Sequence, residues 1–91
     1  MSITALDWDE GNITHIARHN IDPQELEEAV FDHPGVWERG RNDRYYLLSR
    51  SVSGRYIFAV FAYLKQGFAR PVTARDMIET EKHRYEKRCG K

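Results

Sequence analysis

The sequence predicts an α+β domain: two N-terminal helices, a four-stranded antiparallel sheet and a C-terminal helix. Three observations predict this class. A central run of β-branched and aromatic residues indicates a strand, glycine-containing turns bound it, and helix-start patterns occur near both ends of the chain. A chain of 91 residues is long enough for one modest hydrophobic core, so we expect residues 1–91 to form a single domain.

The expected centre of the sheet is the segment 55–64. It carries no charge after Arg55, and turn signals bound it at Ser53-Gly54 and at Lys65-Gln66-Gly67. Apolar side chains fall on odd and even positions alike, which indicates a strand that is covered on both faces. The periodicity alone would also fit a buried helix. The length of the run and its flanking glycines favour a strand.

The first 20 residues predict a short lead-in and then a helix. Residues 5–9 are either an extended segment or a first strand, and a helix is expected to begin at Glu10. Its apolar stripe has i, i+3, i+4 spacing and consists of Ile13, Ile16 and Ala17. His15 and His19 would also share a helix face. Because no third ligand accompanies them, they are either a zinc-binding pair or two ordinary histidines, and the second interpretation is favoured.

The second helix has the clearest start signal in the chain. Asp22 suits the N-cap, Pro23 suits the first helical position, and Glu25 follows the cap by three residues. The dipeptide Pro34-Gly35 is expected to end this helix. Its acidic outer face is either simply solvated or a docking surface for a basic partner.

Three more strands and a final helix complete the expected order. The strands are 36–38, 44–51 and 68–73. Pro71 has no backbone N–H, so the last strand is expected either to lie at an edge of the sheet or to lack one hydrogen bond to its neighbour. The final helix is expected to begin at Ala74-Arg75-Asp76, with Asp76 as its cap and Glu79 three residues later. The tail from Glu86 is polar and is expected to fray.

Charge is unevenly divided along a chain whose formal net charge is zero. The first 34 residues carry eight acidic residues and a single base, Arg18, whereas the remainder carries 13 bases, mostly arginine, and six acids. The basic C-terminal part of the chain indicates a polyanion as a binding partner, because the planar guanidinium group of arginine can donate two hydrogen bonds to phosphate oxygens. The alternative is a soluble domain whose two halves attract each other.

The single cysteine, Cys89, leaves no internal disulfide and no cysteine-based metal site, which fits a reducing compartment. No apolar run is long enough for a membrane span, so no membrane partner is expected. The expected location is the cytoplasm.

Several stretches, in order along the chain, resemble the BrnT-like toxin family. They are Asp7-Trp8-Asp9-Glu10-Gly11-Asn12-Ile13 with His15-Ile16 and Arg18-His19; Asp22-Pro23 with Glu25, Glu27-Glu28-Ala29-Val30-Phe31 and Pro34; Gly40-Arg41 with Arg44-Tyr45, Leu47, Ser51 and Gly54-Arg55-Tyr56; and Thr73-Ala74-Arg75-Asp76-Met77 with Glu81 and Tyr85. The resemblance covers about residues 6–85. Several motifs in order are more specific than any one alone.

The resemblance implies a RelE-like fold and a small bacterial ribonuclease toxin of a type II toxin–antitoxin pair. RNA would be the substrate. The implied partner is a cognate antitoxin, a BrnA-like ribbon-helix-helix protein, and DNA would be contacted only through the complex with it. Many members have a lysine early in the first helix and Lys-His-Gly at its end, where this chain has Asn12 and Arg18-His19-Asn20. The alternative is therefore a non-catalytic, toxin-like module that binds a protein or RNA.

RNA cleavage without a metal or cofactor needs a base or dipole at the 2′-OH, cations for the phosphorane charge, and an acid for the leaving oxygen. Arg75 is the first candidate, because it stands at a strand end just before a helix start, where amide groups favour an anion. Its alternative role is to pair with Asp76 or Glu79. Arg50, on a neighbouring strand, is the second candidate and is otherwise an ordinary charge at the sheet edge.

Three further residues complete the candidate set. His19 is chemically the best proton-transfer group, and a structural hydrogen bond to the second helix is its alternative. Glu81 and Tyr85 lie one turn apart on the last helix. Glu81 acts either as a base or as the residue that orients an arginine, and Tyr85 either stacks on a base or belongs to the core. Trp8 and Trp37 are expected in the core. The sequence contains no glycine-rich phosphate loop and no nucleophile elbow.

Overall fold

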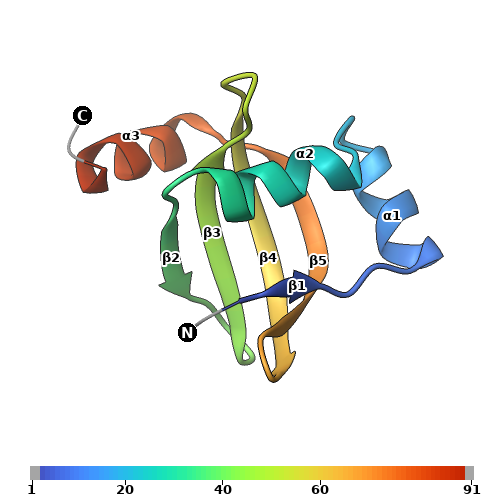
Figure 1. Cartoon of the computed structure of the whole chain (residues 1–91). Coiled ribbons are helices and arrows are strands. Elements are labelled where there is room, and N and C mark those ends of the chain that lie inside the picture. Colours follow the sequence, from blue (N-terminus) through green and yellow to red (C-terminus); the bar gives the residue numbers. More distant parts are fainter. Residues whose placement is uncertain (1–2, 90–91) are drawn as a thin grey trace.

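The sheet of this protein has five strands in the order β1-β5-β4-β3-β2 (Figure 1). The structure, a computed structural model, describes residues 3–89. The strands are β1 (Ala5–Leu6), β2 (Val36–Arg39), β3 (Arg44–Arg50), β4 (Tyr56–Lys65) and β5 (Phe68–Asp76). The helical elements are α1 (Glu10–Ala17), α2 (Pro23–Glu27), the π-helical segment η1 (Glu28–Asp32) that continues α2, and α3 (Glu79–Arg88).

The prediction of four antiparallel strands is wrong in one respect. β2, β3, β4 and β5 pair antiparallel with their neighbours, but β1 adds a fifth strand that runs parallel to β5. Ala5 lies opposite Phe68, and Leu6 lies opposite Ala69. The lead-in joins the sheet because Leu6 is buried in the main core beside Ala69. The fold is thus α+β with a mixed sheet.

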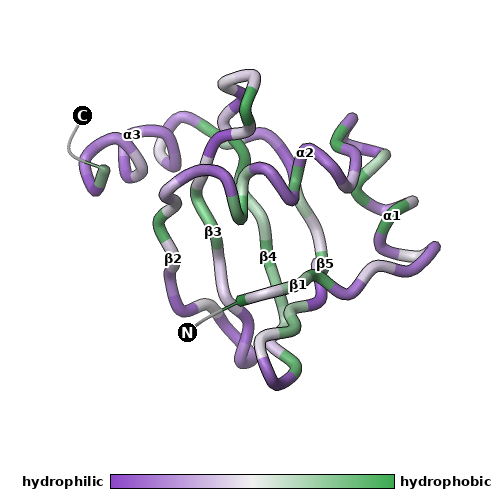
Figure 2. Tube along the Cα trace, in the orientation of Figure 1, coloured by the Kyte–Doolittle hydropathy of each residue, from purple (hydrophilic) through white to green (hydrophobic). Residues whose placement is uncertain are grey.

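The predicted central strand is confirmed, since β4 lies between β3 and β5 and pairs with both. Its side chains are buried on both faces, as at Ile57, Phe58 and Ala59. Figure 2 shows hydrophobic residues along β3 and β4, in contrast to the largely hydrophilic α3. Pro71 lies opposite Phe61, where the β4–β5 register shifts, so the proline occupies an irregular part of the ladder.

Both N-terminal helices begin at the residues that the sequence predicts. The Asp9 side chain accepts a hydrogen bond from the Asn12 amide at 2.8 Å, and the Asn12 side chain accepts one from the Asp9 amide at 2.9 Å. Asp22 caps α2 by accepting from the Glu25 amide at 2.8 Å. The predicted stripe of α1 is wrong in part: Ile16 is fully buried, but Ile13 is 38% exposed. The α1 helix packs beside β5 at the edge of the sheet, so only a narrow part of it reaches the core.

The C-terminal part differs from the prediction. β5 continues to Asp76, and α3 begins at Glu79 rather than at residues 74–76. Asp76 is not a cap, because its carboxylate accepts a hydrogen bond from Arg55 at 2.7 Å; the first turn of α3 is capped instead by Glu81, which accepts from the Ile78 amide at 2.9 Å. The expected fraying from Glu86 is also wrong. The α3 helix reaches Arg88 because Tyr85 is buried in a second cluster on the sheet.

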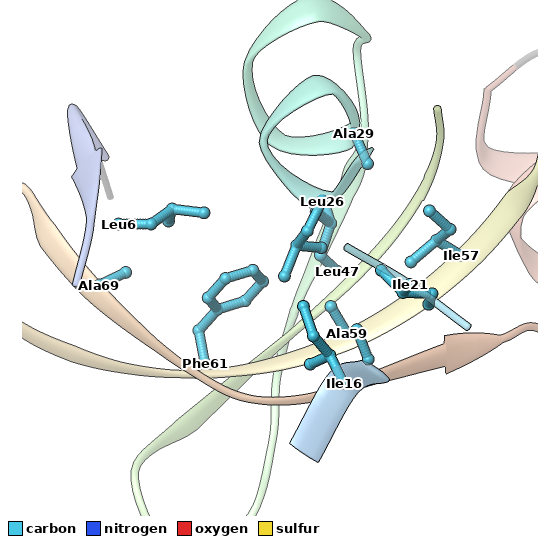
Figure 3. Packing of buried hydrophobic residues seen from close by; sticks show 11 residues of the cluster. Leu6, Ile16, Ile21, Leu26, Ala29, Leu47, Ile57, Ala59, Phe61 and Ala69 are labelled. Carbon is cyan, nitrogen blue, oxygen red and sulfur yellow. The ribbon is translucent and has the colours of Figure 1, made fainter. Parts of the chain in front are cut away.

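One face of the sheet, here called the covered face, carries the main core. Side chains from β3, β4 and β5 point toward α1, α2 and the segment between them, as Figure 3 shows for Phe61, Ile16 and Leu26. The buried residues of this cluster are Leu6, Ile16, Ile21, Leu26, Ala29, Leu47, Ile57, Ala59, Phe61, Ala69 and Ala74. Trp8 and Trp37 pack against this core while remaining partly exposed. In the described part of the chain, no helix combines the length and the apolar character needed to cross a membrane.

The opposite face, here called the open face, is left uncovered by α1 and α2. Its residues are Val36 and Glu38 of β2, Arg44, Tyr46, Leu48 and Arg50 of β3, Tyr56, Phe58, Val60 and Ala62 of β4, and Arg70, Thr73 and Arg75 of β5. The α3 helix, together with Met77 just before it, covers one end of this face, where Met77 and Tyr85 pack with Val36, Leu48 and Phe58. The rest of this face is only half-buried.

Arg55 holds the helices on the covered face. Its guanidinium donates to the Asp76 carboxylate at 2.7 Å, to the Glu25 carboxylate at 3.1 Å and to the His19 carbonyl at 2.9 Å. It also donates to the Asn20 carbonyl. One side chain therefore joins the end of α1, the start of α2 and the end of β5.

We expect Arg55→Met to lower the free energy of unfolding by about 2–4 kcal/mol, because two carboxylates and two carbonyls lose a partly buried donor. The stability of Arg55→Lys should lie between those of the native chain and Arg55→Met, since an ammonium group keeps the charge but cannot reproduce the planar geometry of the guanidinium. Urea unfolding at neutral pH measures both changes. The matched control is Arg39→Met, which removes a 67% exposed side chain from a surface pair and should change stability by less than about 0.5 kcal/mol. Equal effects of the Arg39 and Arg55 substitutions would contradict this role.

Candidate functional site

The open face is rich in arginine. The four arginines on it are Arg44, Arg50, Arg70 and Arg75. They come from β3 and β5, the two strands that flank β4. Because Ala62 lies opposite both Arg44 and Arg70, these three residues form one row across the sheet, whereas Arg50 and Arg75 lie toward the end that α3 covers. Aromatic side chains lie between the two ends, and Tyr46 contacts Phe58 with ring centroids 5.3 Å apart.

The structure brings together Arg75 and Glu81, as the sequence suggested for an arginine-orienting carboxylate. Both oxygens of Glu81 accept hydrogen bonds from Arg75, each at 2.9 Å. The guanidinium also lies 4.5 Å from the centroid of the Phe58 ring and donates to the Asp76 carbonyl at 3.0 Å. Arg75 thus pairs with Glu81 rather than with the carboxylates of Asp76 or Glu79. It is held rigidly in a bidentate arrangement.

Glu81 is unsuited to act as a general base in this arrangement. Burial alone would raise the pKa of its carboxyl, but the hydrogen bonds from Arg75 and from the Ile78 amide outweigh it and hold that pKa below its usual value. The side chain is therefore ionised at neutral pH, and both of its oxygens are committed. In this structure it positions Arg75.

Arg50 and Tyr85 meet through Tyr56. The Arg50 guanidinium lies 4.9 Å from the centroid of the Tyr56 ring, and the Tyr56 and Tyr85 rings meet edge to face at 5.8 Å. Among residues 3–89, Arg50 forms no ion pair, and its one side-chain hydrogen bond goes to the Gly54 carbonyl at 3.4 Å. Burial raises the pKa of Tyr85, with a contribution from the neighbouring Cys89. Tyr85 thus keeps its proton and belongs to the second core cluster.

His19 lies apart from this group. It is exposed at the end of α1, and its backbone carbonyl accepts the hydrogen bond from Arg55. Its ring meets that of His15 at 6.0 Å. Within the described residues, no hydrogen bond or ion pair joins His19 to Arg50, Arg75 or Glu81. Arg55 links His19 to α2, because it donates both to the His19 carbonyl and to the Glu25 carboxylate. This arrangement is closer to the structural role considered for His19 than to proton transfer.

Sequence reasoning missed a second group of polar residues beside α1. A shallow pocket of about 300 Å³ is lined by Gly11, Asn12, His15, Arg44, Arg70, Pro71 and Val72. The His15 Nε2 atom lies 3.0 Å from the Thr73 hydroxyl. The signals for His15 in the sequence were its spacing from His19 and its place in a stretch that resembles the BrnT-like family. Among residues 3–89, no group of three or more His, Cys, Asp or Glu side chains is placed to hold a metal ion. Strand register, which the sequence does not reveal, brings Arg44 and Arg70 to one pocket.

These observations define a class of protein: a small α+β domain with helices packed on one face of a mixed sheet and arginines on the other. Residues 8–81 match the family model described as the ribonuclease toxin, BrnT, of type II toxin–antitoxin systems. The chain belongs to the BrnT toxin family. Membership in a type II family implies an antitoxin partner.

A solved structure shows the same fold. The chain resembles the 1.1 Å crystal structure of the Brucella abortus ribonuclease toxin, BrnT, with a TM-score of 0.66 over 82% of this chain and 97% of that one. The two sequences are 18% identical, so this likeness shows the shared fold alone. The search of curated proteins found no match.

The substitution Glu81→Gln is expected to make the free energy of unfolding less dependent on pH in the acidic range. Because the pKa of Glu81 is lowered on folding, the stability that its charge contributes is fully present above the unfolded pKa of about 4.5. That contribution is lost as the pH falls through the folded value. The difference in unfolding free energy between the native chain and Glu81→Gln should therefore shrink below about pH 4.5.

Urea unfolding at neutral pH and at about pH 3.5 measures this difference. Glu79→Gln serves as the control, because Glu79 is exposed on the same helix and forms no ion pair among the described residues. If the native chain and Glu81→Gln differ in stability by the same amount at both pH values, the pair does not depend on the charge of Glu81.

Proposed function

We propose that this chain is a metal-independent endoribonuclease, the toxin of a type II pair, and that RNA binds on its open face. One observation carries the proposal. The sheet face that α1 and α2 leave uncovered presents arginines on both sides of a central strand, with aromatic rings between them. Guanidinium groups bind phosphate oxygens, and aromatic side chains stack on unpaired bases.

Arg50 and Arg75 are the proposed charge-stabilising residues. Arg50 has donors that are not used by any carboxylate of the described chain, so they are available to a phosphate. Arg75 is already oriented by Glu81 and Phe58, so it needs no rearrangement when the substrate binds. Fixed cations of this kind stabilise charge that develops in a transition state.

The proposed reaction needs no metal, and water is not incorporated into the products. The ribose 2′-oxygen attacks the adjacent phosphorus and gives its proton to solvent water, while the bond from phosphorus to the 5′-oxygen breaks and that oxygen takes a proton from solvent water. The products are a 2′,3′-cyclic phosphate and a 5′-hydroxyl. Arg50 and Arg75 would neutralise the charge on the phosphorane oxygens. His19, although suited chemically to proton transfer, lies apart from both arginines, and we assign it no step.

The proposed partner is a cognate antitoxin of the BrnA-like, ribbon-helix-helix kind. DNA would be contacted by the complex with that antitoxin rather than by this chain alone. The proposed place of action is the cytoplasm. These proposals are supported by membership in a type II toxin–antitoxin family.

A non-catalytic binding module is the second candidate. The observation that favours it is the arrangement around Arg75: the neighbouring carboxylate, Glu81, is committed to an ion pair, and the buried Tyr85 keeps its proton. Neither group is a free base. A module of this kind would bind RNA or an antitoxin without cutting.

Induction of the chain in a bacterial host separates the two functions. The native chain should arrest growth and degrade RNA. Arg50→Gln should slow cleavage on the order of 100-fold and relieve the arrest, because it removes a cation that acts on the transition-state charge. Arg50 is a better choice than Arg75, whose loss would leave the Glu81 carboxylate buried without its partner. Growth curves and gel analysis of total RNA measure both effects.

The control is Arg39→Gln, which removes the same charge on β2 from a side chain that lies over Tyr45 and pairs with Asp43. It should behave like the native chain. Unchanged arrest and RNA loss with soluble Arg50→Gln would refute the role of Arg50. Intact RNA with abundant, soluble native protein would favour the binding module.

A further inference from the structure

We propose that the pocket beside α1, lined by His15, Arg44 and Arg70, is a subsite for a phosphodiester of the RNA chain. This inference rests on the proposed function and adds a binding site to it. The pocket lies between α1 and β5, and Arg44 of β3 also lines it. It therefore lies at the opposite end of the open face from Arg75 and Glu81.

Arg44 is the residue that points most directly to an anionic ligand. It is half-buried, and among the described residues its side chain forms no hydrogen bond and no ion pair. A cation that is partly withdrawn from water and lacks a partner gains most from binding an anion. By contrast, Arg55, Arg70, Arg75 and Arg84 are each paired with carboxylates.

Arg70 forms a fixed wall of the same pocket. Its guanidinium is paired with Asp9 and lies 3.4 Å from a carboxylate oxygen of Asp7. Asp9 is itself anchored, because hydrogen bonds from the Asn12 amide and from Arg70 lower the pKa of its carboxyl and keep it ionised. These two aspartates hold Arg70 in place, but their negative charges also repel an anion that binds close to them. The phosphate is therefore expected nearer to Arg44 and His15.

His15 supplies a second polar group that faces this position. The contact of 3.0 Å between its Nε2 atom and the Thr73 hydroxyl fixes the ring against β5. Either ring nitrogen of a histidine can donate a hydrogen bond to a phosphate oxygen, depending on the tautomer. The pocket thus combines one unpaired guanidinium, one paired guanidinium and one oriented imidazole.

The register of the sheet favours an RNA chain over an isolated phosphate. Arg44 and Arg70 are separated only by Ala62, two strand spacings or roughly 10 Å in backbone distance, so a small side chain lies between them. The next row of the open face carries Tyr46, whose ring contacts Phe58, and Phe58 in turn contacts Arg75. Phe58 itself is buried with Met77 and Tyr85, so the half-buried Tyr46 is the ring that an RNA chain meets between the pocket and Arg75. One RNA strand can cross this face with a phosphate at each end.

Fluorescence anisotropy with a short, labelled 2′-O-methyl RNA tests the subsite directly. This probe cannot be cut, because its 2′-oxygen carries a methyl group in place of the proton of the nucleophile. Arg44→Gln should weaken binding about tenfold and reduce the slope of log affinity against log salt by about one, the signature of one lost phosphate contact. Arg39→Gln, which loses the same charge on β2, should bind like the native chain.

A second pair of variants tests the same site without removing an arginine. Ala62→Glu places a carboxylate between Arg44 and Arg70 and should weaken binding more than tenfold. Ala62→Gln introduces a neutral side chain of nearly the same size and should weaken binding less than Ala62→Glu, so the difference between the two variants measures the effect of the charge. Any loss of fold caused by a larger side chain would appear equally in both, and circular dichroism measures it.

The results distinguish this inference from the proposed function. Native-like binding by Arg44→Gln, or equal binding by Ala62→Glu and Ala62→Gln, would overturn the subsite even if the native chain degrades RNA in cells. Failure of the native chain to bind the probe would also overturn it. Tight, Arg44-dependent binding in a chain that leaves cellular RNA intact would uphold the subsite and refute the ribonuclease.

Discussion

The structure depends most on the way Arg55 ties both N-terminal helices to one side of the sheet. Its guanidinium reaches the residues just after α1, the first turn of α2 and the final residue of β5. These segments are distant in sequence, and within residues 3–89 no other side chain donates to all three. Because the helices are held on the covered face, the arginines of the other face stay accessible.

The open face combines two kinds of arginine that suit different tasks. Arg75 is locked by Glu81 and by the Phe58 ring, which prepares it to bind an oxygen without rearranging. Arg50 and Arg44 have no carboxylate partner among residues 3–89, so they retain donors for a ligand. The α3 helix contributes Glu81 and Tyr85, and it owes its position on the sheet to the burial of these two residues. The same helix therefore completes the core and orients the site.

Local signals in the sequence were sufficient for the central strand, the two capped helices and the α+β class. They failed where long-range contacts decide the structure. Asp76 has the spacing of a helix cap, but its carboxylate binds Arg55, so β5 continues and α3 starts later. The two-residue strand β1 is stabilised by burial of Leu6 rather than by any pattern of its own. The pairing of Arg75 with Glu81 was among the expected roles, whereas the pocket around Arg44 depends on strand register and was not foreseen.

Binding of RNA to the open face of the sheet can be observed at the arginine side chains themselves. Nuclear magnetic resonance of the arginine Nε–H groups, recorded with and without a 2′-O-methyl RNA, detects which guanidinium groups contact the ligand. We expect shifts for Arg44, Arg50 and Arg75, with Arg39 and Arg55 unchanged, because the last two lie outside the open face. Shifts confined to Arg39 or Arg55, or to the amide groups of α2, would place the RNA on another surface and refute binding at the open face.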